Sequence, residues 1–216
     1  MKPLFKAAMA ALPLVAILRG ITPGEVEAVG DALVVAGFRI VEIPLTSFDP
    51  FLSIARLVER LGPDVIVGAG TVRRVDQLDE MIAAGGRLMV TPHADTTLIR
   101  AATERGLITL PGVATPTEAF AALDAGADGL KLFPAEMIPA SAVAAFRTVV
   151  GPDVALCPTG GIAPDDLAGY FKAGATGFGL GGALYRPGDR ASDVGARARR
   201  FVASWQAIFA EVEPET

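Results

Sequence analysis

The chain has 216 residues, 51% of them hydrophobic and 20% charged, which is enough for one large domain with a substantial core or for two small ones. Its formal net charge of −5 argues against a surface that binds nucleic acid, and no apolar stretch reaches the roughly 18 uncharged residues that a membrane span needs. Cys157 is the single cysteine, so the sequence predicts no disulfide framework and a reducing, cytoplasmic environment.

Helical and strand-like segments alternate along the chain. Residues 1–12 are predicted to form a helix that covers the bottom of the fold; they mimic a signal peptide weakly, but no small-residue cleavage site is clear and residues 15–18 serve better as a first strand. About the last ten residues, which include EVEPET, are expected to be loose. Eight short, mostly apolar runs are typical of strands covered on both faces: 15–19, 40–45, 65–70, 88–91, 108–111, 129–133, 155–158 and 177–180.

Helices are predicted between these strands. TPGE at 22–25 and TPTE at 115–118 each offer a threonine N-cap and a glutamate that closes a capping box. Glycines that suit helix C-caps recur at the period of one strand, one helix and two loops: Gly37, Gly62, Gly85, Gly106, Gly126, Gly151 and Gly174. Eight such units without a linker predict a single α/β domain over residues 1–216, a closed (β/α)8 TIM barrel. A doubly wound open sheet is the alternative, although LRGITPGE at 18–25 lacks its GxGxxG fingerprint.

Active sites of such barrels lie at the C-terminal ends of the strands. The residues expected there are Arg19, Glu42, Thr46, Thr71, His93, Lys131, Thr159 and the pairs Gly160–Gly161 and Gly181–Gly182. Lys131 is unusual, because only four of the 19 Lys and Arg residues are lysines and it alone lies within a predicted strand. A desolvated lysine can lose its proton and attack a carbonyl carbon, which arginine cannot do. Lys131 is therefore a candidate nucleophile.

Glu42 places a carboxylate in the apolar strand sequence IVEIPL. Burial raises the pKa of such a group and a nearby ammonium lowers it, so the balance can leave the pKa near neutrality, which suits a proton shuttle. A purely structural ion pair between Glu42 and Lys131 is the alternative interpretation of both residues.

The glycine pairs follow the last two predicted strands, where backbone N–H groups in this fold often bind phosphate. His93 is the only histidine, and no neighbour completes a zinc site, so it is interpreted as a loop residue and no metal is predicted. No GxSxG serine motif is present. These observations leave amine catalysis on a phosphorylated carbonyl compound.

Eight motifs together resemble one family. In chain order they are AILRGITP, VEIPLTS, VGAGTV, VTPHAD, LPGVATPTEA, LKLFPAE, PTGGI and GLGGALYRPG. From Leu14 to Pro187 the chain is similar to the class I 2-keto-3-deoxy-6-phosphogluconate and 6-phosphogalactonate aldolases. AILRGITP, Thr46 after the second strand, and LYRPG favour the galactonate branch.

The resemblance implies a Schiff base on Lys131, Glu42 as general acid and base, Arg19 in contact with the substrate and Thr71 on the pyruvyl carboxylate. The other substrate-binding residues that it implies are Phe133 beside the lysine, Thr159, and the phosphate-binding glycines Gly160, Gly161, Gly181 and Gly182. It further implies a phosphorylated keto-deoxy sugar acid as substrate, pyruvate and D-glyceraldehyde 3-phosphate as products, no metal or other cofactor, and a homotrimer.

The preferred epimer stays open at this point. Thr159 is typical of the gluconate branch, whereas Ala183 replaces a serine that gluconate-type members have near the phosphate. Two other functions would share the barrel and the glycines: a phosphosugar epimerase or isomerase, and a non-catalytic barrel that binds a phosphorylated metabolite. The common metal-dependent epimerases need histidines that this chain lacks.

Overall fold

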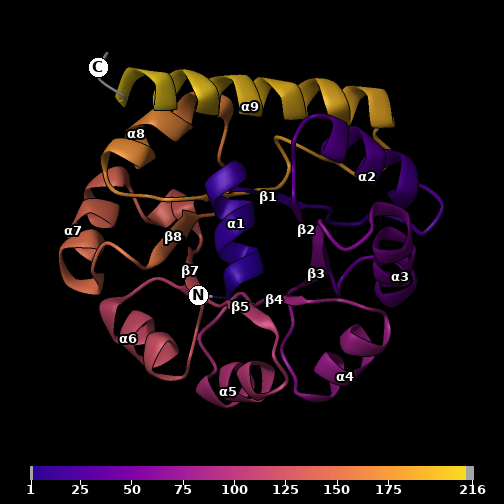
Figure 1. Cartoon of the computed structure of the whole chain (residues 1–216). Helices are drawn as coiled ribbons and strands as arrows, with labels where there is room; N and C mark the ends of the chain where they lie inside the picture. Colours follow the sequence, from indigo (N-terminus) through magenta and orange to yellow (C-terminus); the bar gives the residue numbers. More distant parts are fainter. Residues whose placement is uncertain (1, 213–216) are drawn as a thin grey trace.

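The computed structural model describes residues 2–212 and shows parallel strands surrounded by helices (Figure 1). The strands are β1 (Leu14–Ile17), β2 (Ile40–Pro44), β3 (Ile66–Gly70), β4 (Leu88–Val90), β5 (Ile108–Leu110), β6 (Gly112–Val113), β7 (Gly129–Leu132), β8 (Ala155–Pro158) and β9 (Phe178–Leu180). The helices are α1 (Pro3–Ala11), α2 (Val26–Val35), α3 (Pro50–Leu61), α4 (Asp76–Ala83), α5 (Thr96–Glu104), α6 (Pro116–Asp124), α7 (Ala140–Val150), α8 (Leu167–Lys172) and α9 (Ala191–Val212), with short 3-10 turns η1 (Ala135–Met137) and η2 (Pro164–Asp166).

The strands form two parallel sheets. One has the order β5-β4-β3-β2-β1-β9 and the other the order β6-β7-β8. The predicted run 108–111 corresponds to β5, and beyond Pro111 a further short strand, β6, follows that was not predicted. The Pro111 carbonyl accepts a hydrogen bond from the Lys131 backbone N–H at 2.9 Å. Thr159, after β8, forms an isolated parallel bridge with Gly179 of β9. The prediction of an α/β fold with parallel strands is confirmed.

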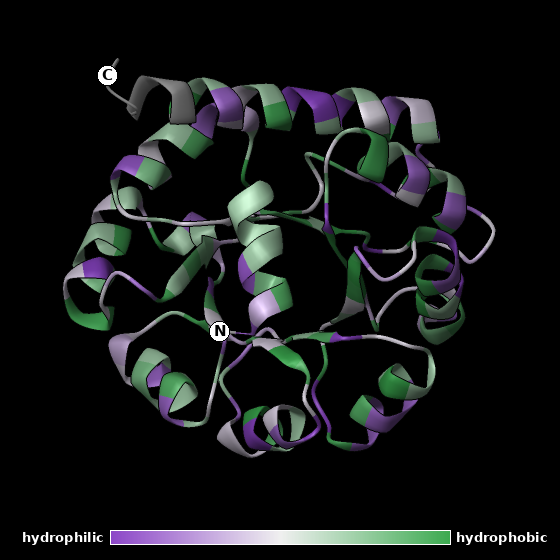
Figure 2. Cartoon of the chain, viewed as in Figure 1, coloured by the Kyte–Doolittle hydropathy of each residue, from purple (hydrophilic) through white to green (hydrophobic). Residues whose placement is uncertain are grey.

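Strand burial explains the apolar runs in the sequence. Every residue of β1 to β9 is buried, and Figure 2 shows mostly apolar strands inside helices of mixed polarity. A second core cluster joins Phe5 of α1 to the inward-facing residues near the starts of several strands, among them Val15, Ile40 and Ile66. Helix α1 therefore covers the N-terminal ends of the strands, as predicted. Side chains alternate along a strand, so the residues two places further on also face inward.

The ends of two predicted helices differ from the structure. Residues 207–212, expected to be loose, continue α9, because Val194, Ala198, Phe201 and Trp205 form a buried stripe at helical spacing. Residues 213–216, and Met1 at the other end, lie outside the described residues. Helix α2 begins only at Val26, so Thr22 does not serve as its side-chain N-cap. The glutamate half of the predicted capping box is present, because the Glu25 carboxylate accepts a hydrogen bond from the Thr22 backbone N–H at 3.0 Å. The capping box of TPTE is present, with the Thr115 hydroxyl accepting from the Glu118 N–H.

No helix within residues 2–212 is both long enough and apolar enough to cross a membrane.

The seven glycines predicted as helix C-caps all have positive φ values. Glycine adopts this left-handed conformation without a Cβ clash, which is why the period was visible in the sequence.

Candidate active site

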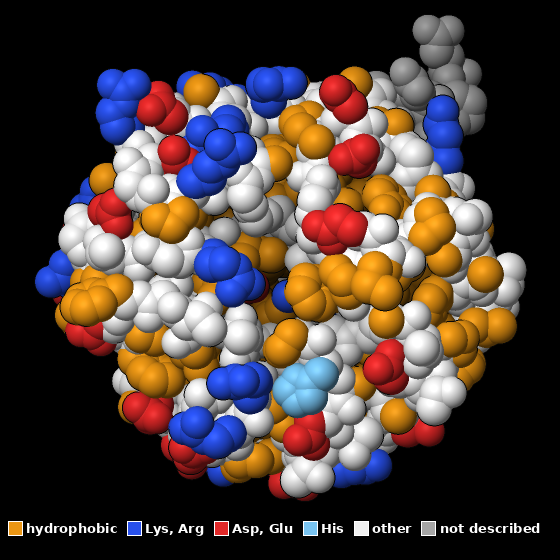
Figure 3. Space-filling view, turned by 180° about the vertical axis from the view of Figure 1, so that it is seen from behind, with side chains coloured by type: hydrophobic (Ala, Val, Ile, Leu, Met, Phe, Trp, Pro, Cys, Tyr) orange, Lys and Arg blue, Asp and Glu red, His pale blue; other side chains and the backbone are white. Residues whose placement is uncertain are grey.

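The C-terminal ends of the strands form the face opposite α1, and Figure 3 shows that this face is hollowed near its centre. The hollow is a cavity of about 680 Å³. Its lining residues are Ile17, Arg19, Lys131, Phe133, Thr159, Gly160, Gly161, Ile162, Gly181, Gly182, Ala183 and Arg186. A separate cavity of about 480 Å³ beside α1 contains none of the predicted site residues. Of those residues, Glu42, Thr46, Thr71 and His93 do not line the larger cavity.

Lys131 lies in β7, in register with Cys157 of β8, and only 5% of the residue is exposed. Gly129 is the first residue of β7, and Lys131 follows it by two residues. The Lys131 Nζ lies over the Phe133 ring, 4.8 Å from its centroid. The described part of the chain offers Nζ no hydrogen bond or ion pair. Burial lowers the pKa of Lys131, Glu42 opposes this shift and Arg19 adds to it. The amine can therefore lose its proton more readily than an ordinary lysine.

Glu42 lies in β2, two residues after the inward-facing Ile40, and is 1% exposed. Burial raises the pKa of its carboxyl from 4.5 to about 7, against the lowering influence of Lys131 and then of Arg19. Glu42 Oε2 is buried without a hydrogen-bond partner among the described residues. No ion pair joins Glu42 to Lys131, although both are described. The two groups act on each other electrostatically without the close contact of a structural salt bridge.

Gly70, the last residue of β3, makes room for the Glu42 carboxylate. It is the register partner of Pro44 in β2. A Cβ atom added to Gly70 would lie 1.7 Å from Glu42 Oε2. Gly70 occurs in the VGAGTV motif, but its role could not be seen in the sequence because the contact joins two strands.

Arg19 follows β1 and holds its guanidinium near both titrating groups. Its Nη1 donates a hydrogen bond of 3.2 Å to Oγ1 of Thr46, which follows β2. The positive charge lowers the pKa of both Glu42 and Lys131. Thr46, which the sequence analysis gave no contact with another site residue, therefore orients the arginine.

Thr71 follows β3 with a φ of 57°. In the described part of the chain, Asp49 is the only other non-glycine residue with a positive φ. A β-branched residue avoids this region, and such strain costs of order 1–3 kcal/mol. The strained backbone sets the direction in which the chain leaves β3 next to Gly70.

Thr159 is 4% exposed and lines the cavity. Its hydroxyl donates to the Cys157 carbonyl at 3.1 Å, and a Cβ on Gly179 of β9 would lie 2.2 Å from Thr159 Oγ1. Because the single hydroxyl proton is used within the protein, Thr159 can offer a ligand only a lone pair.

The two glycine pairs border the same cavity. Gly160 and Gly161 have φ values of 110° and 66°, and a Cβ on Gly181 or Gly182 would meet nothing within 4 Å. The second pair is therefore open to the cavity. The Gly160–Gly161 pair has a carboxylate beside it. A Cβ added to Gly160 would lie 2.5 Å from Oε2 of the exposed Glu136.

Two features of this site were not assigned from the sequence. Arg186 lines the cavity after the second glycine pair; the LYRPG motif contains it, and the adjacent glycines were the available signal. Glu136 ends the LKLFPAE motif, but no glycine pair adjoins it in the sequence. His93 is an exposed loop residue after β4. Residues 2–212 contain no group of three or more His, Cys, Asp or Glu that could hold a metal ion.

Burial raises the pKa of the free Cys157 thiol to about 12, which suppresses its reactivity.

Known proteins are similar to this chain in both sequence and fold. The family model for KDPG and KHG aldolase matches residues 5–195. The chain is 45% identical over 197 residues to a probable 2-dehydro-3-deoxy-6-phosphogalactonate aldolase of Rhizobium meliloti (strain 1021), covering 91% of this chain and 93% of that protein. It is 42% identical over 195 residues to the 2-dehydro-3-deoxy-6-phosphogalactonate aldolase of Escherichia coli (strain K12), covering 90% and 95%. A solved structure described as native KDPGal superposes with a TM-score of 0.90 at 41% identity, covering 92% of this chain and 97% of that one.

Proposed function

This chain belongs to the KDPG and KHG aldolase family, and we propose that it cleaves 2-dehydro-3-deoxy-6-phosphogalactonate into pyruvate and D-glyceraldehyde 3-phosphate through a Schiff base. Membership of this family makes it an aldolase, a carbon–carbon lyase. The observation that carries the proposal is Lys131, a buried amine with a lowered pKa in a cavity that two glycine pairs border. The names of the relatives at 45% and 42% identity support the galactonate epimer over the gluconate epimer.

In the proposed reaction, the neutral amine of Lys131 attacks the C2 ketone, and loss of water leaves an iminium ion. Glu42, directly or through a water molecule, takes the proton of the C4 hydroxyl. The C3–C4 bond then breaks, its electron pair moves into the iminium and forms an enamine of pyruvate, and D-glyceraldehyde 3-phosphate leaves. Glu42 returns a proton to C3, and hydrolysis of the new iminium releases pyruvate and regenerates Lys131. A carboxyl pKa of about 7 lets Glu42 both accept and donate a proton near neutral pH.

The remaining residues are proposed to bind the substrate. Arg19 and Thr71 would hold the acid end, with Thr71 on the pyruvyl carboxylate, and Phe133 would pack beside the lysine. The glycine pairs would bind the phosphate through backbone N–H groups, since an open backbone can approach an anion closely.

The proposal extends to the assembly. The two sheets would form one closed (β/α)8 barrel, and the chain would be a single catalytic domain without a cofactor. The bridge between Thr159 and Gly179 supports closure of the barrel.

The protein would be a homotrimer in the cytoplasm. Val35, Phe48 and Met137, which are 82%, 72% and 77% exposed, are apolar side chains that subunit contacts could cover, and the free Cys157 fits a reducing compartment.

Pyruvate release is the direct test. Incubation with 2-dehydro-3-deoxy-6-phosphogalactonate, with EDTA present, is expected to yield one pyruvate and one D-glyceraldehyde 3-phosphate for each substrate consumed. An epimerase, an isomerase or a non-catalytic barrel would release no pyruvate.

The epimer preference is expected to depend on Thr159. The two substrates differ only at C4, so discrimination rests on one or two hydrogen bonds, worth ~1–3 kcal/mol or roughly tenfold to two-hundredfold in kcat/KM. We expect the wild type to prefer the galactonate epimer and to show measurable activity on the gluconate epimer. Thr159→Val removes the hydroxyl of this cavity-lining residue and should shift the ratio further toward galactonate. The measurement is kcat/KM on both epimers, with Thr148→Val on the exposed face of α7 as control.

Two outcomes would contradict this account separately. A wild-type ratio in favour of the gluconate epimer would overturn the branch assignment. An unchanged ratio in the Thr159→Val variant would show that Thr159 takes no part in discrimination.

Gly70→Ala is expected to lower turnover with little loss of stability. The new Cβ would lie 1.7 Å from Oε2 at the far end of the Glu42 side chain, so the carboxylate must move. Misplacing a proton-transfer group costs about tenfold or more in kcat. Gly169→Ala in α8, where a Cβ meets nothing within 4 Å, is the matched control. Wild-type kcat in the Gly70→Ala variant would show that the position of the carboxylate does not matter.

A further inference from the structure

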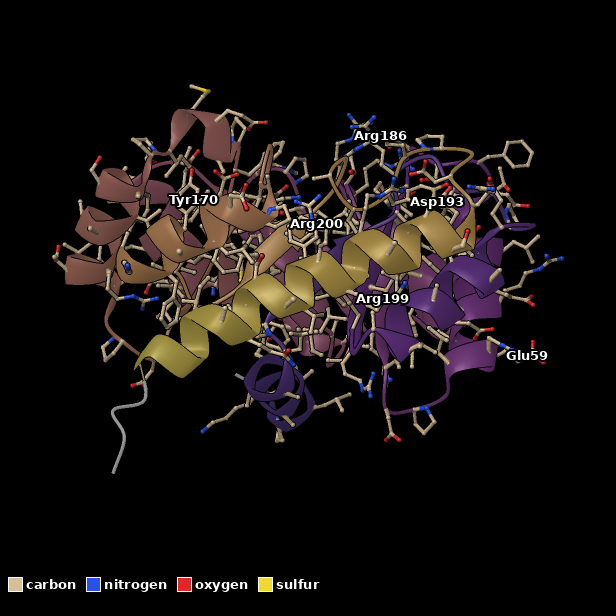
Figure 4. All side chains as sticks on the ribbon, turned by 90° about the horizontal axis from the view of Figure 1, so that it is seen from above. Glu59, Tyr170, Arg186, Asp193, Arg199 and Arg200 are labelled. Carbon is tan, nitrogen blue, oxygen red and sulfur yellow. The ribbon has the colours of Figure 1, made fainter. Side chains whose placement is uncertain are left out.

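Arg186 lies on the wall of the cavity, in the segment that follows the second glycine pair. Figure 4 places it on the edge of the molecule opposite α1, which is the face where the strands end. Lys131 is part of β7, whereas the glycine pairs come after the last residues of β8 and β9. The cavity therefore runs from a reacting amine inside the strands to a cation and open glycines beyond the strand ends.

The side chain of Arg186 is anchored through one atom only. Its Nε–H donates to the Gly182 carbonyl at 3.1 Å, and its backbone N–H donates to the Asp189 carboxylate at 2.7 Å. A guanidinium has five N–H donors, and the described residues use only the Nε–H of this one. The remaining donors, on Nη1 and Nη2, are held near Gly182 without a partner.

The charge of Arg186 is also unpaired. Arg60, Arg74, Arg105, Arg190 and Arg197 each form an ion pair with an aspartate. Asp189 is the carboxylate nearest to Arg186 along the chain, and it pairs with Arg197. No ion pair involves Arg186 in the described part of the protein. An arginine on a cavity wall that forms no ion pair is suited to binding a dianion, because a guanidinium can donate two parallel hydrogen bonds to a phosphate.

We propose that Arg186 binds the phosphate group of the substrate together with the backbone of Gly181 and Gly182. This rests on the proposed function, which supplies a phosphate at the end of the substrate far from the ketone. The Glu136 carboxylate lies beside Gly160 and would repel a phosphate dianion there. A positive charge nearby is therefore needed to offset this repulsion. Arg186 is thus a substrate-binding residue of the phosphate end, and it takes no part in bond cleavage.

The condensation direction separates this role from a structural one. Pyruvate is offered with D-glyceraldehyde 3-phosphate or with unphosphorylated D-glyceraldehyde as acceptor. Loss of a charge-assisted interaction is worth ~1.5–3 kcal/mol, so Arg186→Met should raise KM for the phosphorylated acceptor roughly 10- to 100-fold. The rate with D-glyceraldehyde should change by less than about twofold, and Arg186→Lys should recover part of the loss. Arg200→Met, on the exposed part of α9 (Figure 4), should change neither.

A binding measurement keeps this proposal independent of catalysis. Titration calorimetry with glycerol 3-phosphate should give a Kd at least about tenfold weaker for Arg186→Met than for wild type. Equal Kd values, or an equal loss with both acceptors, would overturn the role of Arg186. The wild-type protein could instead bind glycerol 3-phosphate through Arg186 and release no pyruvate from the substrate. That result would contradict the proposed reaction but support the phosphate site.

Discussion

Borohydride reduction in the presence of pyruvate is expected to add one pyruvyl group to the protein, at Lys131. The amine is buried, its pKa is lowered mainly by desolvation, and no partner among the described residues holds its proton. A neutral amine forms an imine with the ketone of pyruvate, and borohydride reduces that imine to a stable secondary amine. Mass spectrometry of the intact protein and of its peptides measures both the number and the position of the label.

Lys131→Ala should abolish the label and reduce turnover by at least ~10³-fold, since the nucleophile is lost. The matched control is Lys172→Ala, which removes an exposed lysine in the last turn of α8 and should leave label and turnover unchanged. Full activity in the Lys131→Ala variant, or label on Lys172 in the wild type, would contradict the Schiff-base mechanism.

Glu42→Gln is expected to lower kcat by ~10²-fold or more, the usual scale for the loss of a general acid or base. Binding of glycerol 3-phosphate should stay close to wild type. The imine with pyruvate should still form on Lys131, because removing the Glu42 charge takes away the one influence that raises the pKa of Lys131. Trapping without turnover would therefore separate the role of Glu42 from that of the nucleophile.

The same substitution makes a prediction about stability and pH. The pKa of Glu42 is raised from 4.5 to about 7 in the folded protein, so between these values the folded state holds a proton that the unfolded state has released. Stability from this group is therefore greatest at low pH and is lost as pH rises through about 7. Glu42→Gln should remove that decline, with thermal unfolding measured across the pH range. Proton abstraction needs the carboxylate, so wild-type kcat should rise over the same interval.

Glu59→Gln, on the exposed surface of α3 (Figure 4), is the matched control and should change neither kcat nor the melting temperature. A structural role for Glu42 predicts the opposite pattern. In that case the Gln variant would melt early, with a buried and unpaired Lys131, and would keep its rate per folded molecule.

Local sequence determined the strands, the helix ends with positive φ, and the two buried charged residues. These features depend on near neighbours: apolar runs, a glycine after most helices, and the two-residue alternation along each strand. Glu42 follows the inward-facing Ile40 by two residues, and Lys131 is in register with the inward-facing Cys157. The N-terminal helix was predictable for the same reason. The extent of α9 was not, because its apolar stripe, which is buried as far as Ile208, is covered only by packing against other elements.

Only the tertiary structure decided how the site residues meet. Glu42 has room because Gly70 lies opposite on the neighbouring strand, and Arg19 is oriented by Thr46, 27 residues away in sequence. Thr159 commits its proton to a backbone carbonyl, and Glu136 lies beside Gly160. Each of these contacts depends on strand register and loop path, which are set by burial of the whole core rather than by any short stretch of residues. The sequence therefore determined which groups are candidates for the chemistry, while packing of distant segments decided their partners, their pKa shifts and the unpaired Nη donors of Arg186.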